Sequence, residues 1–88
     1  MDDDVVVVGE LPAIADVVLC LAACCRSVTV VTLRKARAGV LRGCANVTIV
    51  SGAEVVCVDG LDGVESVVVR KIRTGAVSAY NASALFVI

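Results

Sequence analysis

The feature that most constrains the fold is an uninterrupted run of valines, Val5 to Val8, which ends at Gly9. A continuous β-branched run of this kind is typical of a strand that is buried on both faces. Pro12 and the run rich in alanine and leucine after it predict a helix over 12–25, because Pro suits a first helical turn and Ala and Leu favour helix. We therefore expect a strand, a glycine turn and a helix in succession.

Two further valine-rich segments, 28–31 and 47–50, predict two more strands. The basic stretch 33–42 between them suits a short helix. An alternation of strands and helices favours parallel strands that are joined by right-handed crossovers. This half of the chain therefore predicts a parallel sheet with one or two helices.

The pattern changes in the second half of the chain. Strand-like segments over 54–58, 64–73 and 77–81 are separated by short turns that contain glycine, which is typical of antiparallel hairpins. The final run, 84–88, is apolar and predicts one more buried strand. The expected fold is an α/β, three-layer, Rossmann-like domain with a parallel sheet, one or two helices and an antiparallel β-meander.

Length and composition limit the class of protein. The 88 residues predict a single domain over 1–88, and 59% hydrophobic residues exclude intrinsic disorder. A formal charge of -1 argues against a basic nucleic-acid binder. The most apolar run, Ala13 to Cys25, is interrupted by Asp16 and is shorter than the ~20 residues that span a bilayer.

The apolar content exceeds what a domain of this size can bury, so we expect an apolar face that is covered by another domain or by a second copy. Residues 1–4 form an acidic tail, which has the wrong charge for a signal peptide. These observations favour a cytoplasmic domain fragment, without nucleic-acid or membrane partners.

The chain has no histidine, and this excludes a Ser-His-Asp or Cys-His catalytic arrangement. Its cysteines are Cys20, Cys24, Cys25, Cys44 and Cys57. Their spacing does not match a zinc finger, so we expect no metal site. We interpret these cysteines as small buried hydrophobic residues with free thiols.

A strand, a glycine turn, a helix and a second strand form the dinucleotide-binding unit, in which backbone at the helix start approaches a pyrophosphate. Of the G-x-G-x-x-G/A fingerprint, the run from Gly9 to Ile14 keeps the first glycine. Leu11 stands where a side chain crowds the phosphates, and Ile14 stands where a small residue is usual. An ordinary strand-to-helix turn explains the same run.

The end of the second strand carries the nucleotide specificity in such folds. An acidic residue there binds the ribose hydroxyls of NAD, and an arginine accommodates the 2′-phosphate of NADP. Here Thr32 is followed by Arg34, Lys35 and Arg37, and this basic group fits NADP better than NAD. A solvated helix start explains the same residues, and both interpretations stay open.

Several segments together resemble the NADP-binding domain of thioredoxin reductases and their low-molecular-weight flavoprotein relatives. They are Asp4 to Gly9, Cys25 to Arg34, Val64 to Gly75 and Ala84 to Ile88. The resemblance extends over essentially the whole chain, and it implies that the meander over 54–81 covers the sheet face opposite the helix. Of the family's His-Arg-Arg loop, Thr32-Leu33-Arg34 keeps the last residue, and Arg37 is one place away from a later arginine.

The departures from the family concern its chemistry. Its redox Cys-x-x-Cys and its flavin domain lie outside this chain, and the resemblance therefore implies a domain without catalytic residues. The chain by itself is then inactive, and FAD belongs to the missing domain. That missing domain, a second copy and a thioredoxin-like protein substrate are the partners that the resemblance implies.

The leading hypothesis is the NADP(H)-binding domain of an oxidoreductase that passes electrons from NADPH to flavin and then to a disulfide. Gly9 and the backbone of Glu10 and Leu11 would face the pyrophosphate. Thr32, Arg34 and Arg37 would face the 2′-phosphate, with binding weakened or lost through Leu11. The alternatives are a degenerate interaction or structural module without enzymatic activity, and a truncated product that binds no nucleotide.

Overall fold

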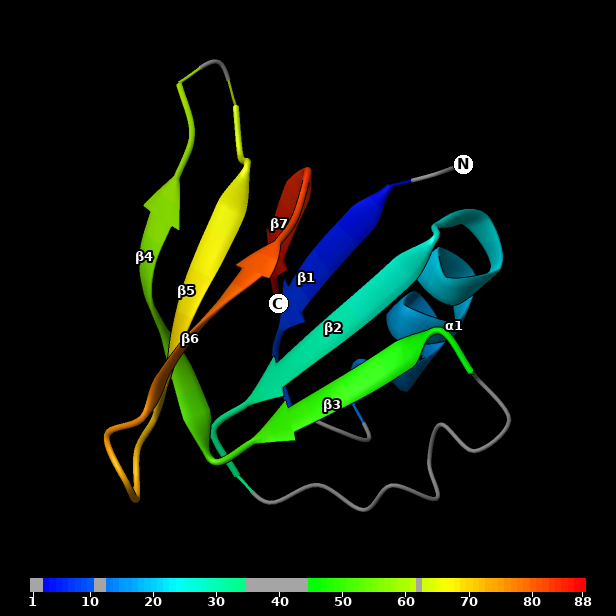
Figure 1. The fold of residues 1–88 in the computed structure, drawn as a ribbon. Helices are drawn as coiled ribbons and strands as arrows, with labels where there is room; N and C mark the ends of the chain where they lie inside the picture. Colours follow the sequence, from blue (N-terminus) through cyan, green and yellow to red (C-terminus); the bar gives the residue numbers. More distant parts are fainter. Residues whose placement is uncertain (1–2, 11–12, 35–44, 62) are drawn as a thin grey trace.

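In a computed structural model, which describes residues 3–10, 13–34, 45–61 and 63–88, the chain forms two sheets and a helix (Figure 1). The parallel sheet consists of β1 (Asp4–Val8), β2 (Ser27–Thr32), β3 (Val47–Ser51) and β7 (Ala84–Val87). The antiparallel sheet consists of β4 (Ala53–Asp59), β5 (Ser66–Lys71) and β6 (Val77–Asn81), and the helix is α1 (Ala15–Cys24).

The parallel sheet has the strand order β3-β2-β1-β7, which places the valine run of β1 between two neighbours. Val8 is the register partner of Val31 in β2 and of Val87 in β7. Both pairings of β1 and the β2–β3 pairing are parallel, as predicted from the alternation of strands and helix. The four strands therefore end at one edge of the sheet, which we call the carboxyl edge.

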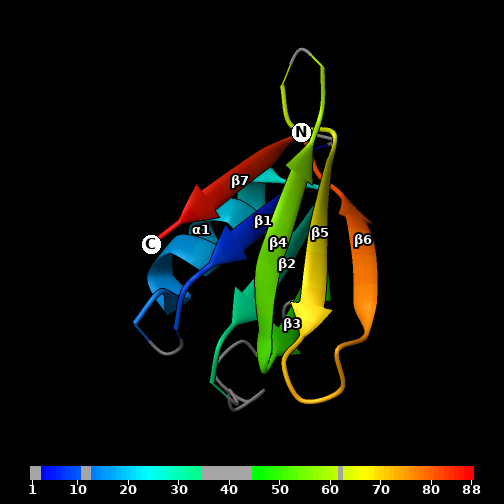
Figure 2. The same cartoon turned by 90° about the vertical axis from the view of Figure 1, so that its left-hand side faces the viewer.

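Both faces of the parallel sheet are covered, and this explains the uninterrupted valines of β1. Val5 and Val7 face α1 and pack in a cluster with Ile14 and Val18. Val6 faces the opposite way and packs in a cluster that includes residues of the antiparallel sheet. Figure 1 and Figure 2 show α1 on one side of the parallel sheet and β4–β6 on the other. The predicted three layers are confirmed.

Helix α1 begins later than the sequence predicts. Its first residue is Ala15, not a residue near 12, and Ile14 at its N-cap makes no side-chain capping hydrogen bond. Most of the second helix predicted over 33–42 lies outside the described residues. Helix α1 has ten residues, and the described parts of the chain contain no helix that is both long and apolar enough to cross a membrane.

The antiparallel sheet follows the predicted meander, with β4 pairing β5 and β5 pairing β6. The register of β4 against β5 shifts between Val55 and Cys57, an irregularity of the β-bulge type. The turn between β5 and β6 contains Gly75 with a φ of 75°, a left-handed conformation that glycine adopts without strain. The strand expected over 64–73 is observed as β5, which covers only Ser66–Lys71.

Large apolar side chains remain exposed on this fold, as the composition predicts. Val77 in β6 is 61% exposed, and Val87 in β7 is 74% exposed. Strand β7 is an edge of the parallel sheet, and an apolar edge strand is a template for pairing with another chain.

We therefore expect the chain to self-associate at micromolar concentration, and Val87→Lys to weaken this association by placing a charge on the edge strand. Sedimentation velocity over a range of concentrations measures both effects. Ser78→Lys, an exposed change in β6, is the control for added charge. A parent chain that stays monomeric at high concentration would contradict the expectation.

Candidate functional site

The carboxyl edge of the parallel sheet brings together the residues that the sequence singles out. Gly9 follows β1, and its N–H donates to the Val31 carbonyl oxygen at 3.2 Å, which joins the turn to the end of β2. On the other side of β1, the Ile88 N–H donates to the Val8 carbonyl oxygen at 2.9 Å. The turn after β1 is therefore held between β2 and β7.

Gly9 is buried and lies against the start of the helix. A Cβ atom at this position would be 2.9 Å from Cγ2 of Ile14 and 3.2 Å from the Ile88 carbonyl oxygen. The absence of a side chain at Gly9 is thus what lets a large residue such as Ile14 enter the core at the strand-to-helix turn. In dinucleotide-binding folds, a small residue at the place of Ile14 lets the helix pack closely on the sheet. In this chain Gly9 provides the space for that packing.

The start of α1 is directed to the same edge, because the helix follows the β1 turn. The Ile14 N–H donates to the Glu10 carbonyl oxygen at 3.2 Å, and the Val18 N–H donates to the Ile14 carbonyl oxygen at 3.1 Å. Backbone N–H groups at an uncapped helix start are donors for an anionic group. Asp16 in the first turn offsets part of this positive potential.

Glu10 connects the ends of β1 and β2 through its side chain. Its Oε2 accepts a hydrogen bond from the Leu33 N–H at 2.8 Å, and its Oε1 accepts one from the Arg34 N–H at 3.0 Å. The sequence prediction assigned only the backbone of Glu10 to the site. The signal that points to its side chain is the parallel order itself, since residues just beyond neighbouring parallel strands meet at one edge.

Thr32 and Arg34 lie close together but differ in exposure. The Thr32 side chain is 1% exposed, and its Oγ1 donates to the Arg34 carbonyl oxygen at 2.7 Å. Arg34 itself is exposed. Thr32 therefore fixes the backbone from which the Arg34 side chain projects, and a phosphate contact of either residue stays a prediction. Leu11 and Arg37 lie outside the described residues.

A hollow of about 480 Å³ is a feature that the sequence did not indicate. It is lined by Ser51, Gly52, Lys71, Arg73 and Thr74. Ser51 is the register partner of Thr32, so the hollow adjoins the carboxyl edge on the β3 side. The Lys71 ammonium donates to the Ser51 carbonyl oxygen at 3.2 Å, which brings a positive charge close to this edge.

The cysteines are not the buried residues that the sequence predicted. Cys20, Cys24 and Cys57 are exposed, Cys25 is half-buried, and these described cysteines are free thiols. Cys44 lies outside the described residues. The prediction fails because α1 is apolar on every side and packs on the sheet through one side only. Hydrogen bonding to Asp59 and the charge of that carboxylate raise the pKa of the Cys57 thiol, which disfavours the reactive thiolate.

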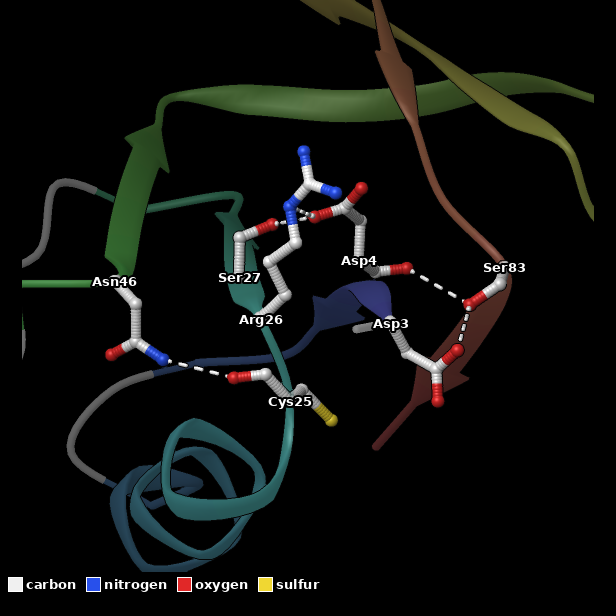
Figure 3. A network of polar contacts seen from close by, with 7 residues as sticks. All are labelled: Asp3, Asp4, Cys25, Arg26, Ser27, Asn46 and Ser83. Atoms are coloured by element: carbon white, nitrogen blue, oxygen red, sulfur yellow. Dashed lines mark hydrogen bonds and ion pairs between the residues drawn. The ribbon is translucent and has the colours of Figure 1, made fainter. Parts of the chain in front are cut away.

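The opposite, amino edge of the sheet carries a polar network that holds the strands together (Figure 3). The Ser27 hydroxyl donates to Asp4 Oδ1 at 2.6 Å, and the Arg26 side chain forms an ion pair with the same oxygen at 3.8 Å. The Asn46 amide donates to the Cys25 carbonyl oxygen at 3.1 Å (Figure 3). The Ser83 N–H donates to the Asp4 carbonyl oxygen at 2.8 Å, which joins β7 to β1. These contacts connect chain segments and leave the carboxyl edge as the candidate site.

Comparison with solved structures shows the same arrangement within larger proteins. Thioredoxin reductase from Streptococcus pyogenes MGAS5005 matches with a TM-score of 0.83 and 26% identity, covering 98% of this chain and 30% of its own. Thioredoxin reductase from Giardia duodenalis matches with a TM-score of 0.88 and 22% identity, covering 100% of this chain and 31% of its own.

A bacillithiol disulfide reductase from Staphylococcus aureus matches with a TM-score of 0.78 and 17% identity, covering 100% of this chain and 29% of its own. No family model and no curated protein sequence matches the chain. The chain thus has the fold of a thioredoxin-reductase-like fragment, and it spans about 30% of the length of these reductases.

Proposed function

We propose that the chain is the NADP(H)-binding domain of a thioredoxin-reductase-like oxidoreductase. One observation carries the proposal: the glycine turn after β1, the uncapped start of α1 and the exposed Arg34 after β2 all lie at the carboxyl edge. In open α/β sheets, ligands bind in the crevice outside the carboxyl ends of the strands. The matches to thioredoxin reductases support the same assignment.

In this proposal the residues have separate tasks. The backbone of Gly9, Glu10 and Leu11 and the start of α1 face the pyrophosphate. Arg34 and Arg37 face the 2′-phosphate, and Thr32 positions Arg34 through the hydrogen bond to its carbonyl oxygen. Bound NADPH supplies a hydride to the flavin of a separate domain, which then reduces a disulfide. The exposed valines Val77 in β6 and Val87 in β7 suit contact with that domain or with a second copy of the chain. The proposed compartment of this oxidoreductase is the cytoplasm.

Isothermal titration calorimetry of the chain with NADPH and NADH tests the proposal. We expect NADPH to bind more tightly, because Arg34 forms charge-assisted hydrogen bonds with a 2′-phosphate that NADH lacks. Arg34→Ala should lower the NADPH affinity by about ten-fold or more and leave the NADH affinity unchanged. Arg26→Ala removes the same charge at the amino edge and should change neither affinity.

A degenerate module that binds no nucleotide is the second candidate. Leu11 at a glycine position of the fingerprint and the exposed apolar side chains favour it. The two candidates differ in the same titration, because the module gives no binding heat with either nucleotide. An NADPH affinity that Arg34→Ala and Arg26→Ala lower equally would also argue against a specific phosphate contact.

A further inference from the structure

The Glu10 carboxylate is bound by two consecutive backbone N–H groups, those of Leu33 and Arg34, which we call the amide pair. Each carboxylate oxygen accepts one of these hydrogen bonds, at 2.8 and 3.0 Å. Two successive N–H groups that converge on one acceptor form a site suited to an anion. In this chain the anion is an internal carboxylate that comes from the turn after the neighbouring strand.

The position of this contact matters because it lies between the ends of β1 and β2. The register pairs Val8 with Val31, so Glu10 and the amide pair both stand just beyond the carboxyl edge. At the end of the second strand, dinucleotide-binding folds place the group that meets the adenosine ribose. Neither Thr32 nor Arg34 has a carboxylate, but the Glu10 carboxylate, from the turn after β1, lies at this position.

The Glu10 carboxylate retains acceptor capacity while it is bound. A carboxylate has about four lone-pair sites, and the amide pair uses two of them. The remaining sites can accept hydrogen bonds from the two hydroxyl groups of an unphosphorylated ribose. A 2′-phosphate instead brings negative charge to a carboxylate and finds the amide pair already occupied.

From this geometry, and on the basis of the proposed nucleotide-binding function, we infer that Glu10 is a specificity-determining residue that lowers the preference for NADPH over NADH. Arg34 and Glu10 then act on the same ribose substituent with opposite sign. The exposed Arg34 guanidinium attracts a 2′-phosphate. The half-buried Glu10 carboxylate repels the phosphate and accepts hydrogen bonds from a 2′-hydroxyl.

Glu10→Gln tests this inference, because it preserves the side-chain length and removes the charge. We expect the ratio of NADPH to NADH affinity, measured by calorimetry, to rise about ten-fold. Glu65→Gln is the matched control, since Glu65 is exposed and its carbonyl oxygen accepts from Ala82 close to the amino edge. It should leave the ratio unchanged. Glu10→Ala, which removes the whole carboxylate, is the second variant, and circular dichroism checks that both variants fold.

The contact itself has a separate readout in the amide resonances of Leu33 and Arg34. In Glu10→Ala, which leaves both N–H groups of the amide pair without their side-chain acceptor, inorganic phosphate should shift these resonances, and in the parent it should leave them unchanged. A raised ratio together with this shift supports the inference. If the nucleotides bind but neither Glu10 variant alters the ratio, the inference is wrong and the proposed function stands. If no variant binds a nucleotide, both are wrong.

Discussion

Gly9→Ala should destabilise the chain by about 1–3 kcal/mol, the usual cost of forcing an extra methyl group into a packed core. The added Cβ would be 2.9 Å from Cγ2 and 3.1 Å from Cδ1 of Ile14, and 3.2 Å from a backbone oxygen of Ile88. Ile14 is 3% exposed and packs on Val5 and Val7, so it has little space to move. Urea unfolding followed by circular dichroism, at concentrations where the chain is monomeric, measures the change.

The sign of this effect is informative because Gly9 has no positive φ. Without a steric conflict, a glycine-to-alanine change at such a position stabilises a protein by about 0.4–1 kcal/mol through the unfolded state. Ile14→Ala is the matched second change. In a double-mutant cycle, the two substitutions together should cost less than the sum of the single costs. Ile14→Ala removes the Cγ2 and Cδ1 atoms that the added Cβ would meet, and this Cβ fills part of the cavity that Ile14→Ala leaves. An additive cycle would contradict close packing between these residues.

The sequence was sufficient to predict which segments form the parallel sheet, but not the details of their ends. The run from Val5 to Val8 can be buried on both faces only between two layers, and this fixed β1 in the interior. The start of α1 was harder to predict. Its residues favour helix equally well from 12 onward, and the structure begins the helix only at Ala15.

The sequence indicated which backbone positions lie at the candidate site, but it did not indicate the contacts of the side chains there. Gly9 and Arg34 follow directly from a glycine after a strand and a basic group after the next strand. The burial of Thr32 was not predicted, because three consecutive residues from Val30 to Thr32 are buried and the alternation expected of a strand fails there. The reach of Glu10 to the next strand depends on register and rotamer, which spacing in the sequence does not specify.

Leu11→Gly should raise the affinity for NADPH and for NADH by about ten-fold each, equivalent to about 1.4 kcal/mol. Leu11 itself lies outside the described residues, and the expected effect follows from its place in the fingerprint. It stands two residues after Gly9, where glycine lets the backbone approach the pyrophosphate. Both nucleotides share the pyrophosphate, so the ratio of their affinities should not change.

The ratio of the NADPH and NADH affinities distinguishes this substitution from those at Arg34 and Glu10. Those two residues act on the ribose end of the nucleotide, so their substitutions should change the ratio. Leu61→Gly is the control, because Leu61 is 95% exposed in the hairpin between β4 and β5 and its loss should leave binding unchanged. Both variants replace a leucine with glycine, so the control also accounts for the added backbone freedom of glycine. Calorimetry of parent, Leu11→Gly and Leu61→Gly with both nucleotides therefore isolates the pyrophosphate contact. If neither the parent nor Leu11→Gly binds, crowding by Leu11 is not what prevents binding, and the chain is a module that has the dinucleotide-binding fold without its ligand.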